Sequence, residues 1–324
     1  MDKISIIVPC FNEEEAIPVF YATVQPILDE AMQPAVSWEL VFVDDGSTDA
    51  TLELLQALHA KDPRVAYLSF SRNFGKEAGL YAGLLHATGD YVAVMDVDLQ
   101  DPPELLPDMY AYLLAEPLDC VATKRVDRAG EPWLRSLFAR LFYWLMSKIS
   151  QTEIVAGARD FRLMSRPMVD AILSVGEYNR FSKGIFSWVG FRTHYLAYPN
   201  RERRAGRTSW SFWGLVRYSL TGIINFSEVP LNFIAGLGFM AFLGAILLAV
   251  FFAGRTLLFG NATSGWTSLA VLILGMGGLQ MLALGVVGKY VAKTFLETKR
   301  RPLYLLKMSS FEEDDEAEAY SKNV

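Results

Sequence analysis

Three oxygen-bearing side chains follow an apolar segment at a spacing of two residues. They are Asp96, Asp98 and Gln100, and the apolar segment is 91–95. In an extended chain, alternate residues point to the same side, so we expect these side chains to project together where a strand ends. Carboxylate and amide oxygens are ligands of Mg²⁺ and Mn²⁺, which fill their remaining positions with substrate phosphates. The pattern predicts a divalent-cation site, although an acidic turn after a strand has the same composition.

Two further polar clusters follow segments that are typical of buried strands. Asn12 and Glu13 follow residues 4–9, and Asp44 and Asp45 follow residues 39–43. Ligands of parallel α/β sheets bind beyond the carboxyl ends of the strands. If the strands are parallel, all three clusters lie on one edge of the sheet.

The elements that must position these clusters alternate between strand and helix over the first 125 residues. The patterns predict strands at 4–9, 39–43, 65–70, 91–96 and 120–124, and helices at 13–32, 50–60, 76–87 and 104–115. Asp49 or Ser47 is expected to cap the second helix. This alternation predicts an α/β fold with a doubly wound, mostly parallel, Rossmann-like sheet.

Composition and missing motifs exclude several functions. The sequence has neither G-x-G-x-x-G after the first strand nor G-x-x-x-x-G-K-[ST], so an acidic edge that binds a diphosphate needs a bridging cation. The net charge of −6 gives no indication of nucleic-acid binding, and an acidic run at 312–318 accounts for most of it. Cys10 and Cys120 lie in apolar segments, which predicts small, reduced core residues.

The C-terminal part of the sequence predicts a membrane hairpin. Between residues 229 and 288 the only charged residue is Arg255. A helix needs about 20 apolar residues to cross a bilayer, so we expect two transmembrane helices rather than a pair of buried core helices. Lysines and arginines flank the hairpin on the side opposite its connecting loop, which places both termini and the N-terminal domain in the cytoplasm. The apolar run at 4–8 is too short for a signal peptide.

These patterns divide the chain into four parts. We expect residues 1–210 to form a cytoplasmic domain, 211–228 a juxtamembrane amphipathic helix, and 229–292 the two transmembrane helices. Residues 293–324 are expected to be a basic and then acidic tail, largely disordered. The spacing of Ala241 and Ala245 would permit helices of two protomers to pack, so a homo-oligomer is compatible with the sequence.

Four motifs together resemble the family 2 glycosyltransferases of the GT-A fold. They are residues 6–13 (IIVPCFNE), 41–49 (VFVDDGSTD), 72–76 (RNFGK) and 95–104 (MDVDLQDPPE). More narrowly, they resemble polyprenyl-phosphate glycosyltransferases, which include undecaprenyl-phosphate (bactoprenol) glucosyltransferases and dolichol-phosphate mannose synthase. With the hairpin, the resemblance extends to about residue 305.

The resemblance implies inverting transfer of a hexose from a nucleotide sugar to undecaprenyl phosphate at the inner (plasma) membrane. The β-linked lipid-phosphate sugar would serve cell-envelope glycan modification. UDP-glucose is the first expectation for the donor, and GDP-mannose, UDP-GlcNAc and UDP-galactose stay open. A non-catalytic protein that binds the lipid carrier is a second reading. A processive polysaccharide synthase is disfavoured because the sequence contains no Q-x-x-R-W.

The resemblance also implies roles for individual residues. The nucleotide-sugar pocket would comprise Pro9, Asn12, Glu13, Asp44, Asp45, Lys76 and Asp96, and the ligands of Mg²⁺ or Mn²⁺ would be Asp96, Asp98 and Gln100. Asp98 and Asp160 would be catalytic. Because a phosphate monoester is largely ionised near pH 7, Asp160 could position a substrate rather than act as a base.

Arginines are expected to bind the acceptor phosphate, because a guanidinium group binds its oxygens in bidentate fashion. The candidates are Arg125, Arg128, Arg135 and Arg140, followed by Arg203 and Arg207. Residues 133–145 carry an apolar face at helical spacing, which fits an interfacial helix or an amphipathic helix on a soluble core. Ser209 stands where the family has lysine, so a phosphate contact there is in doubt.

Overall fold

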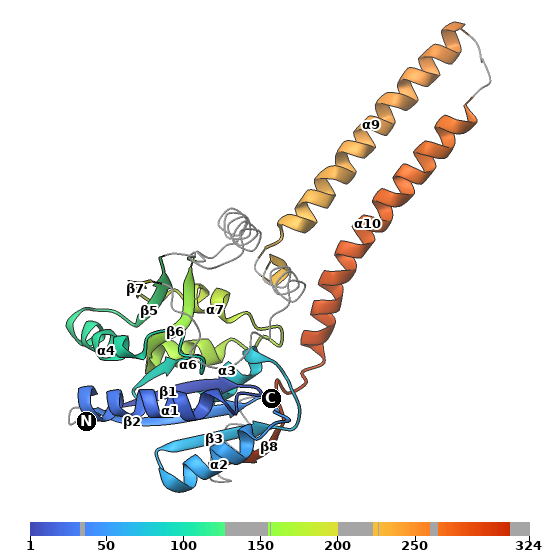
Figure 1. The fold of residues 1–324 in the computed structure, drawn as a ribbon. Helices are drawn as coiled ribbons and strands as arrows, with labels where there is room; N and C mark the ends of the chain where they lie inside the picture. Colours follow the sequence, from blue (N-terminus) through green and yellow to red (C-terminus); the bar gives the residue numbers. More distant parts are fainter. Residues whose placement is uncertain are drawn as a thin grey trace.

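An eight-stranded mixed sheet forms the centre of the N-terminal domain in the computed structural model (Figure 1). The structure describes residues 1–32, 36–126, 155, 157–199, 223–225, 227–259 and 265–311. The strand order is β7-β5-β6-β4-β1-β2-β3-β8. The strands are β1 (Asp2–Cys10), β2 (Val36–Asp44), β3 (Val65–Phe70), β4 (Tyr91–Val94), β5 (Cys120–Arg125), β6 (Ala158–Ser165), β7 (Thr193–Tyr198) and β8 (Leu306–Ser309).

The parallel core of the sheet is arranged as the alternating pattern predicts. Strand β1 pairs in parallel with β2 on one side and with β4 on the other. The chain therefore moves outward from β1 through β2 and β3, and then returns to the far side of β1 as β4. Crevices at such a reversal are where doubly wound sheets bind ligands. The loops after β1 and β4 border this position.

Two antiparallel strands depart from the expected sheet. Strand β6 lies between β4 and β5 and runs antiparallel to both. Strand β8 pairs antiparallel with β3 at the opposite edge. Both strands come from later parts of the chain, so their pairing depends on contacts that are distant in sequence. The insertion of β6 brings its first residues beside the end of β4.

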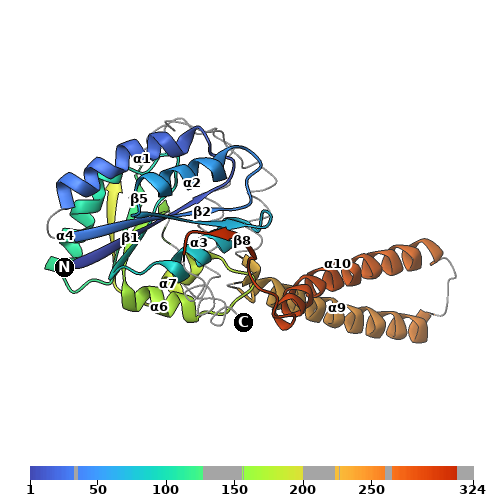
Figure 2. The same ribbon diagram turned by 90° about the horizontal axis from the view of Figure 1, so that it is seen from below.

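Helices cover both faces of the sheet (Figures 1 and 2). One face carries α1 (Ala16–Ile27), α2 (Thr51–Lys61) and α4 (Leu106–Ala115), and the other α3 (Lys76–His86), α6 (Arg166–Ser174) and α7 (Ser182–Trp188). Each face has its own apolar core, with Phe20 and Met109 on the first side and Leu80 and Met168 on the second. Burial of these side chains is the main stabilising contribution to the domain.

Several expected boundaries needed correction. The helix expected at 13–32 is α1 followed by a π-helical turn, Leu28–Met32, and the one expected at 104–115 begins with a 3₁₀ turn, Pro103–Leu105. The N-cap of α2 is Ala50, although the Asp49 carboxylate accepts a hydrogen bond from the Thr51 N–H at 3.1 Å. Cys10 and Cys120 are buried free thiols, as predicted.

Two long helices leave the domain side by side (Figures 1 and 2). They are α9 (Val229–Phe259) and α10 (Trp266–Thr298). Within them, Val229–Phe252 and Gly275–Thr298 are long and apolar enough to cross a membrane, and neither is buried in the protein. Phe233, Leu247 and Met281 each expose about 70% of their surface (69%, 70% and 73%). Continuous apolar exposure on this scale marks an interaction with a membrane or another protein.

The chain beyond α10 returns to the N-terminal domain. Strand β8 extends the sheet at β3, and the Tyr304 ring stacks on Phe70 with centroids 4.8 Å apart. The prediction of a largely disordered tail from residue 293 is therefore wrong as far as residue 311. The edge of β3 presents backbone groups that β8 pairs with and the Phe70 ring, on which Tyr304 stacks. The acidic run lies outside the described residues.

Side chains on the last turns of α10 bind the loop after α6. The Glu297 carboxylate accepts hydrogen bonds from the backbone N–H groups of Tyr178 and Asn179 at 2.9 and 3.0 Å. The Lys293 ammonium donates to Asn179 Oδ1 at 2.8 Å. The hairpin is thus joined to the domain by polar contacts at its base as well as by β8.

The contact between α3 and β1 leaves no room for a side chain at Gly83. A Cβ atom there would lie 2.2 Å from Ile7 Cγ2, and Ile7 is fully buried. We expect Gly83→Ala to lower the free energy of unfolding by about 1–3 kcal/mol and the thermal midpoint in detergent by several degrees. Gly176→Ala is the control, since nothing lies within 4 Å of its Cβ position. A raised midpoint in Gly83→Ala, as helix propensity alone predicts, would contradict this packing.

Candidate active site

Hydrogen bonds join the loops after β1 and β2 at the carboxyl edge of the sheet. The Asn12 N–H donates to Ser47 Oγ at 2.9 Å, and Asn12 Oδ1 accepts from the Thr48 N–H at 2.8 Å. Asn12 has a φ of 54°, a left-handed conformation that asparagine tolerates better than most residues. The structure therefore brings Asn12, with neighbouring Pro9 and Glu13, beside the loop that carries Asp44 and Asp45.

Asp44 and Asp45 order these loops through their carboxylates. Asp44 is buried and accepts from the Ser47 N–H at 2.9 Å and the Ser69 hydroxyl at 2.7 Å. Asp45 accepts from the backbone N–H groups of Phe74 and Gly75 at 2.6 and 2.9 Å. Burial raises the pKa of Asp45 to about 6, and these N–H groups oppose the rise only in part. Both carboxyl groups thus have structural partners within the protein.

Lys76, the first residue of α3, connects two acidic side chains from different strands. Its Nζ lies 2.6 Å from Asp96 Oδ1 and 2.6 Å from Asp160 Oδ2. Asp96 follows β4, and Asp160 belongs to β6, which the insertion of that strand places alongside. The structure therefore brings together Asp96, Asp160 and Lys76, three of the residues singled out in the sequence. About a third of the Lys76 side chain (33%) is exposed, so the cluster is open to ligands.

The charges of this cluster stabilise one another. Burial alone would lower the pKa of Lys76, but the Asp160 and Asp96 carboxylates outweigh it and raise that pKa above its ordinary value. Burial would likewise raise the pKa of Asp160, but Lys76 and then Lys183 outweigh it and hold that pKa well below its ordinary value. Asp160 is therefore a carboxylate throughout the physiological range. A group with so low a pKa is a poor general base.

The chain turns sharply after β4, which contradicts the extended geometry expected for residues 96–100. Strand β4 ends at Val94, a turn follows at residues 97 and 98, and Leu99 has a φ of 54°. The Asp98 carboxylate accepts from the Gln100 N–H at 3.1 Å, a local bond that favours a turn. The prediction of three side chains in one row on a strand is wrong because this side chain competes for the backbone N–H.

The residues of the turn nevertheless fit a hard divalent cation by their chemistry. Asp96 and Asp98 offer carboxylate oxygens, and Gln100 offers an amide oxygen. Asp96 Oδ1 is bonded to Lys76, and Gln100 Oε1 accepts from Arg159 Nη2 at 3.3 Å. Among the described residues, no three His, Cys, Asp or Glu side chains are close enough to hold a metal ion. Substrate phosphates and water would therefore complete the coordination.

Most of the arginines expected to bind the acceptor phosphate lie outside the described residues. These are Arg128, Arg135, Arg140, Arg203 and Arg207. Arg125 is described: it is the last residue of β5, is partly exposed, and donates its backbone N–H to Gly157 O at 3.0 Å. Gly157 has a φ of 79°, and a Cβ atom there would lie 2.8 Å from Arg125 O. This close approach holds Arg125 near the start of β6.

A second group of residues was missed in the sequence. Arg159 Nε donates to Asp101 Oδ1 at 2.8 Å, and the Tyr198 hydroxyl also bonds to Asp101. Asp101 lies in the acidic motif at residues 95–104, so its place in the sequence could have marked it as a site residue. Nothing in the sequence pairs it with Arg159 or Tyr198, which come from β6 and β7.

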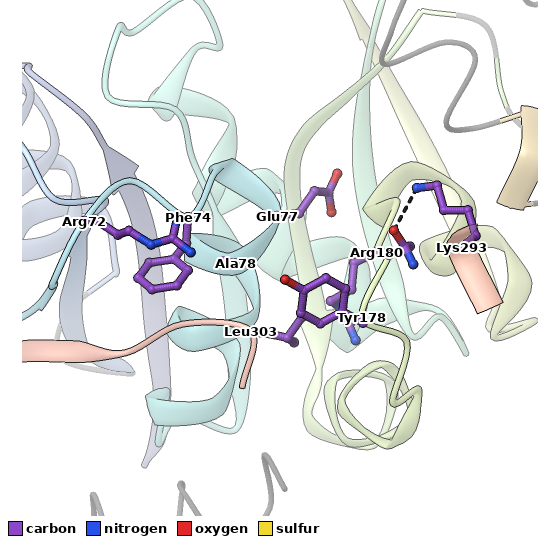
Figure 3. Close-up of a pocket in the computed structure, with 9 residues that line it drawn as sticks. Arg72, Phe74, Glu77, Ala78, Tyr178, Arg180, Lys293 and Leu303 are labelled. Atoms are coloured by element: carbon purple, nitrogen blue, oxygen red, sulfur yellow. Dashed lines mark hydrogen bonds between the residues drawn. The ribbon is translucent and has the colours of Figure 1, made fainter. Parts of the chain in front are cut away.

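A cavity of about 240 Å³ lies at the base of α10 (Figure 3). Charged, aromatic and apolar side chains from four segments line it: Arg72, Phe74, Glu77, Ala78, Tyr178, Asn179, Arg180, Lys293 and Leu303. Arg180 is buried and donates to the carbonyls of Ile172 and Val175 at the end of α6. Glu77, the residue after Lys76, lines the cavity, whereas Asp96 and Asp160 do not.

Comparison with known proteins identifies the family. Residues 5–173 match the sequence profile described as glycosyl transferase family 2. The chain belongs to glycosyl transferase family 2. This confirms the family expected from the four motifs, and the mixed α/β sheet agrees with it.

Two curated relatives match this family 2 glycosyltransferase over nearly its whole length. A protein of Escherichia coli (strain K12) named prophage bactoprenol glucosyl transferase homolog is 46% identical, over 94% of this chain and 98% of its own. The bactoprenol glucosyl transferase of Shigella phage SfX is 45% identical, over 94% and 99%. Glucosyl-3-phosphoglycerate synthase from Mycobacterium tuberculosis, solved with Mn²⁺, UDP-glucose and phosphoglyceric acid, is 21% identical over 69% of this chain and 78% of that one, with a TM-score of 0.46.

Removal of the Lys76 charge should raise the pKa of Asp160, which Lys76 lowers in the wild type. In the wild type, the low pKa of Asp160 gives a stabilising contribution that is present above about pH 4 and lost at lower pH. In Lys76→Gln, burial should raise that pKa, although Lys183 and Arg162 still oppose the rise. The thermal midpoint of Lys76→Gln, relative to wild type, should therefore fall as the pH increases from about 4 to about 7.

The double variant Lys76→Gln/Asp160→Asn is the control for this measurement. It lacks the titrating carboxyl group, so the additional pH dependence should disappear. Equal pH dependence in the wild type and in Lys76→Gln would show that Lys76 does not set the pKa of Asp160.

Proposed function

We propose that this protein transfers a glucosyl group from a nucleotide sugar, UDP-glucose, to undecaprenyl phosphate. The observation that carries the proposal is the identity of 46% with a protein named as a bactoprenol glucosyl transferase homolog, over 94% of this chain. At this coverage, the match extends well beyond the N-terminal domain and into the two long helices. The Asp96–Lys76–Asp160 cluster supports a transferase rather than a non-catalytic carrier-binding protein, because it places paired charges at the ligand-binding edge.

The nucleophile needs little help with deprotonation. A phosphate monoester on a lipid has its second pKa near about 6, so its oxygen is largely ionised near pH 7. The ionised phosphate has no proton to give, so the Asp160 carboxylate is not needed to remove one. We infer that Asp160 acts as a positioning group that orients Lys76 and, through it, the substrates. The lipid phosphate attacks the anomeric carbon in a single displacement, which inverts an α-linked donor to a β-linked product.

Electrostatic stabilisation of the leaving nucleoside diphosphate is the main chemical task. Lys76 places a fixed ammonium between Asp96 and Asp160. We assign Asp96 to the donor side and Asp160 to the acceptor side. Preorganised charges of this kind cost no reorganisation during the reaction. Asp96, Asp98 and Gln100 would hold Mg²⁺ or Mn²⁺, which would neutralise charge on the diphosphate. Pro9, Asn12, Glu13, Asp44 and Asp45 would form the base and ribose pocket, and Arg125 would contact the acceptor phosphate.

The hairpin would bring the catalytic edge to the membrane surface. Strand β1 runs toward the side of the domain from which α9 and α10 leave (Figures 1 and 2). Helices of 31 and 33 residues would be roughly 46 and 50 Å long, more than the hydrocarbon core of about 30 Å requires. We infer that both helices span the inner membrane, with both termini and the catalytic domain in the cytoplasm. A polyprenyl phosphate in that leaflet would then meet the active site by proximity.

Transfer of radiolabel from nucleotide sugars to undecaprenyl phosphate tests this function. The purified full-length protein, in detergent with Mg²⁺ or Mn²⁺, should convert UDP-glucose to a labelled lipid product. UDP-galactose, UDP-GlcNAc and GDP-mannose should give much less product. EDTA should abolish transfer, because the donor diphosphate would lose its counter-charge, and excess Mn²⁺ should restore it.

Each contrary result has a separate meaning. Transfer that is insensitive to EDTA would remove the metal assignment and leave the reaction in place. Preference for another donor would replace glucose as the sugar. Failure with every donor, by a protein that retains its thermal midpoint, would favour the carrier-binding alternative.

A further inference from the structure

Arg159 ties the loop after β4 to the beginning of β6. Its Nε donates to Asp101 Oδ1 at 2.8 Å, and its Nη2 lies 3.3 Å from Gln100 Oε1. Tyr198, the last residue of β7, bonds to the same Asp101 carboxylate through its hydroxyl. Asp101 exposes only 2% of its surface. A buried carboxylate therefore anchors the loop through partners from two other strands.

The contact with Gln100 determines which atom of the amide faces Arg159. A glutamine amide has an oxygen acceptor at one position and a nitrogen donor at the other, and the two differ little in shape. A guanidinium group has only donors, so it selects the oxygen. With one lone pair directed at Arg159, the second lone pair of Gln100 Oε1 stays available on a fixed atom. Arg159 would thus act on Gln100 as hydrogen-bonded outer partners act on metal ligands in other proteins, which they orient.

The same strand carries Asp160 to the other side of the site. Successive side chains of a strand point in opposite directions, so Arg159 and Asp160 are directed apart. Arg159 contacts the Gln100–Asp101 segment, and Asp160 contacts Lys76. Arg162 Nη2 also donates to the Arg159 carbonyl at 3.0 Å, which fixes the backbone between them. The position of β6 is therefore set on both sides by residues of the site.

Arg64 provides a comparison, because its network of contacts lies outside the candidate site. Arg64 binds Asp62 at 2.8 Å and Asp29 at 2.7 Å, and stacks over the Trp38 ring. Both partners are carboxylates, and none of these residues belongs to the candidate site. Arg159 differs because its second partner is a neutral amide that contributes little charge stabilisation. That contact is better explained by the orientation it gives to Gln100.

We propose that Arg159 is a positioning residue that orients the Gln100 amide oxygen and fixes the loop after β4 to hold a divalent cation. The inference rests on the metal assignment within the proposed function. Asp101 is the anchor of this arrangement, and Tyr198 strengthens the anchor. Neither Arg159 nor Asp101 touches the reacting atoms.

Binding of Mn²⁺ to the full-length protein tests the proposal without relying on activity. Free Mn²⁺ is measured from its electron paramagnetic resonance signal during titration, with and without UDP. Arg159→Lys keeps a cation for Asp101 but lacks the second donor arm, so Mn²⁺ should bind about 10–100-fold more weakly than in wild type. Tyr198→Phe, which leaves Arg159 in place, should weaken Mn²⁺ binding by a smaller factor.

Arg64→Lys is the control, since it shortens another aspartate-bound arginine, one that precedes β3 at the amino end of that strand. Its Mn²⁺ affinity should equal that of wild type, whatever its effect on the thermal midpoint. Wild-type Mn²⁺ affinity in Arg159→Lys would overturn the proposal, as would equal weakening in Arg64→Lys. Glucosyl transfer by a wild-type protein that binds no Mn²⁺ would overturn it while leaving the proposed function intact. Normal Mn²⁺ binding by a wild-type protein that transfers no glucose would overturn the proposed function and leave the role of Arg159 in metal binding intact.

Discussion

The ion pairs of Lys76 with Asp96 and Asp160 hold the candidate active site together. Each partner comes from a different element: α3, the loop after β4, and β6. The two carboxylates would repel each other without the ammonium between them, because the cluster is only partly exposed to water. The antiparallel insertion of β6 makes this contact available, since it places Asp160 beside the end of β4. The insertion of β6 is therefore a requirement of the site, and the sheet pairing and the charge pairing support one another.

The helical hairpin of α9 and α10 is also joined to this arrangement. Strand β8 and Tyr304 attach the end of the chain to β3, while Glu297 and Lys293 attach the base of α10 to the loop after α6. That loop leads to α7, which carries Lys183. The Lys183 charge helps to lower the pKa of Asp160. The helices and the site thus share a connected set of contacts.

The sequence predicted the parallel part of the fold well, because that part follows from local patterns. The apolar segment 65–70 coincides with β3, and the polar residues after β1 and β2 meet as the strand alternation requires. Strands β6, β7 and β8 were not predicted, because their pairing depends on partners far away in the chain. The row of side chains expected at Asp96, Asp98 and Gln100 failed for a local reason: the Asp98 carboxylate bonds to the Gln100 N–H and turns the chain. Arg159 was overlooked because its partners come together only through β6.

We infer that Lys76 and Asp160 act as one unit that positions the substrates. A double-mutant cycle of Lys76→Gln and Asp160→Asn, read as kcat/KM for glucosyl transfer, measures the coupling between the two side chains. If the two side chains work through each other, the double variant should be no slower than the slower single variant, with a coupling of about 0.5–3 kcal/mol. If the two effects multiply, each residue acts independently, and the shared role of the ion pair would be contradicted.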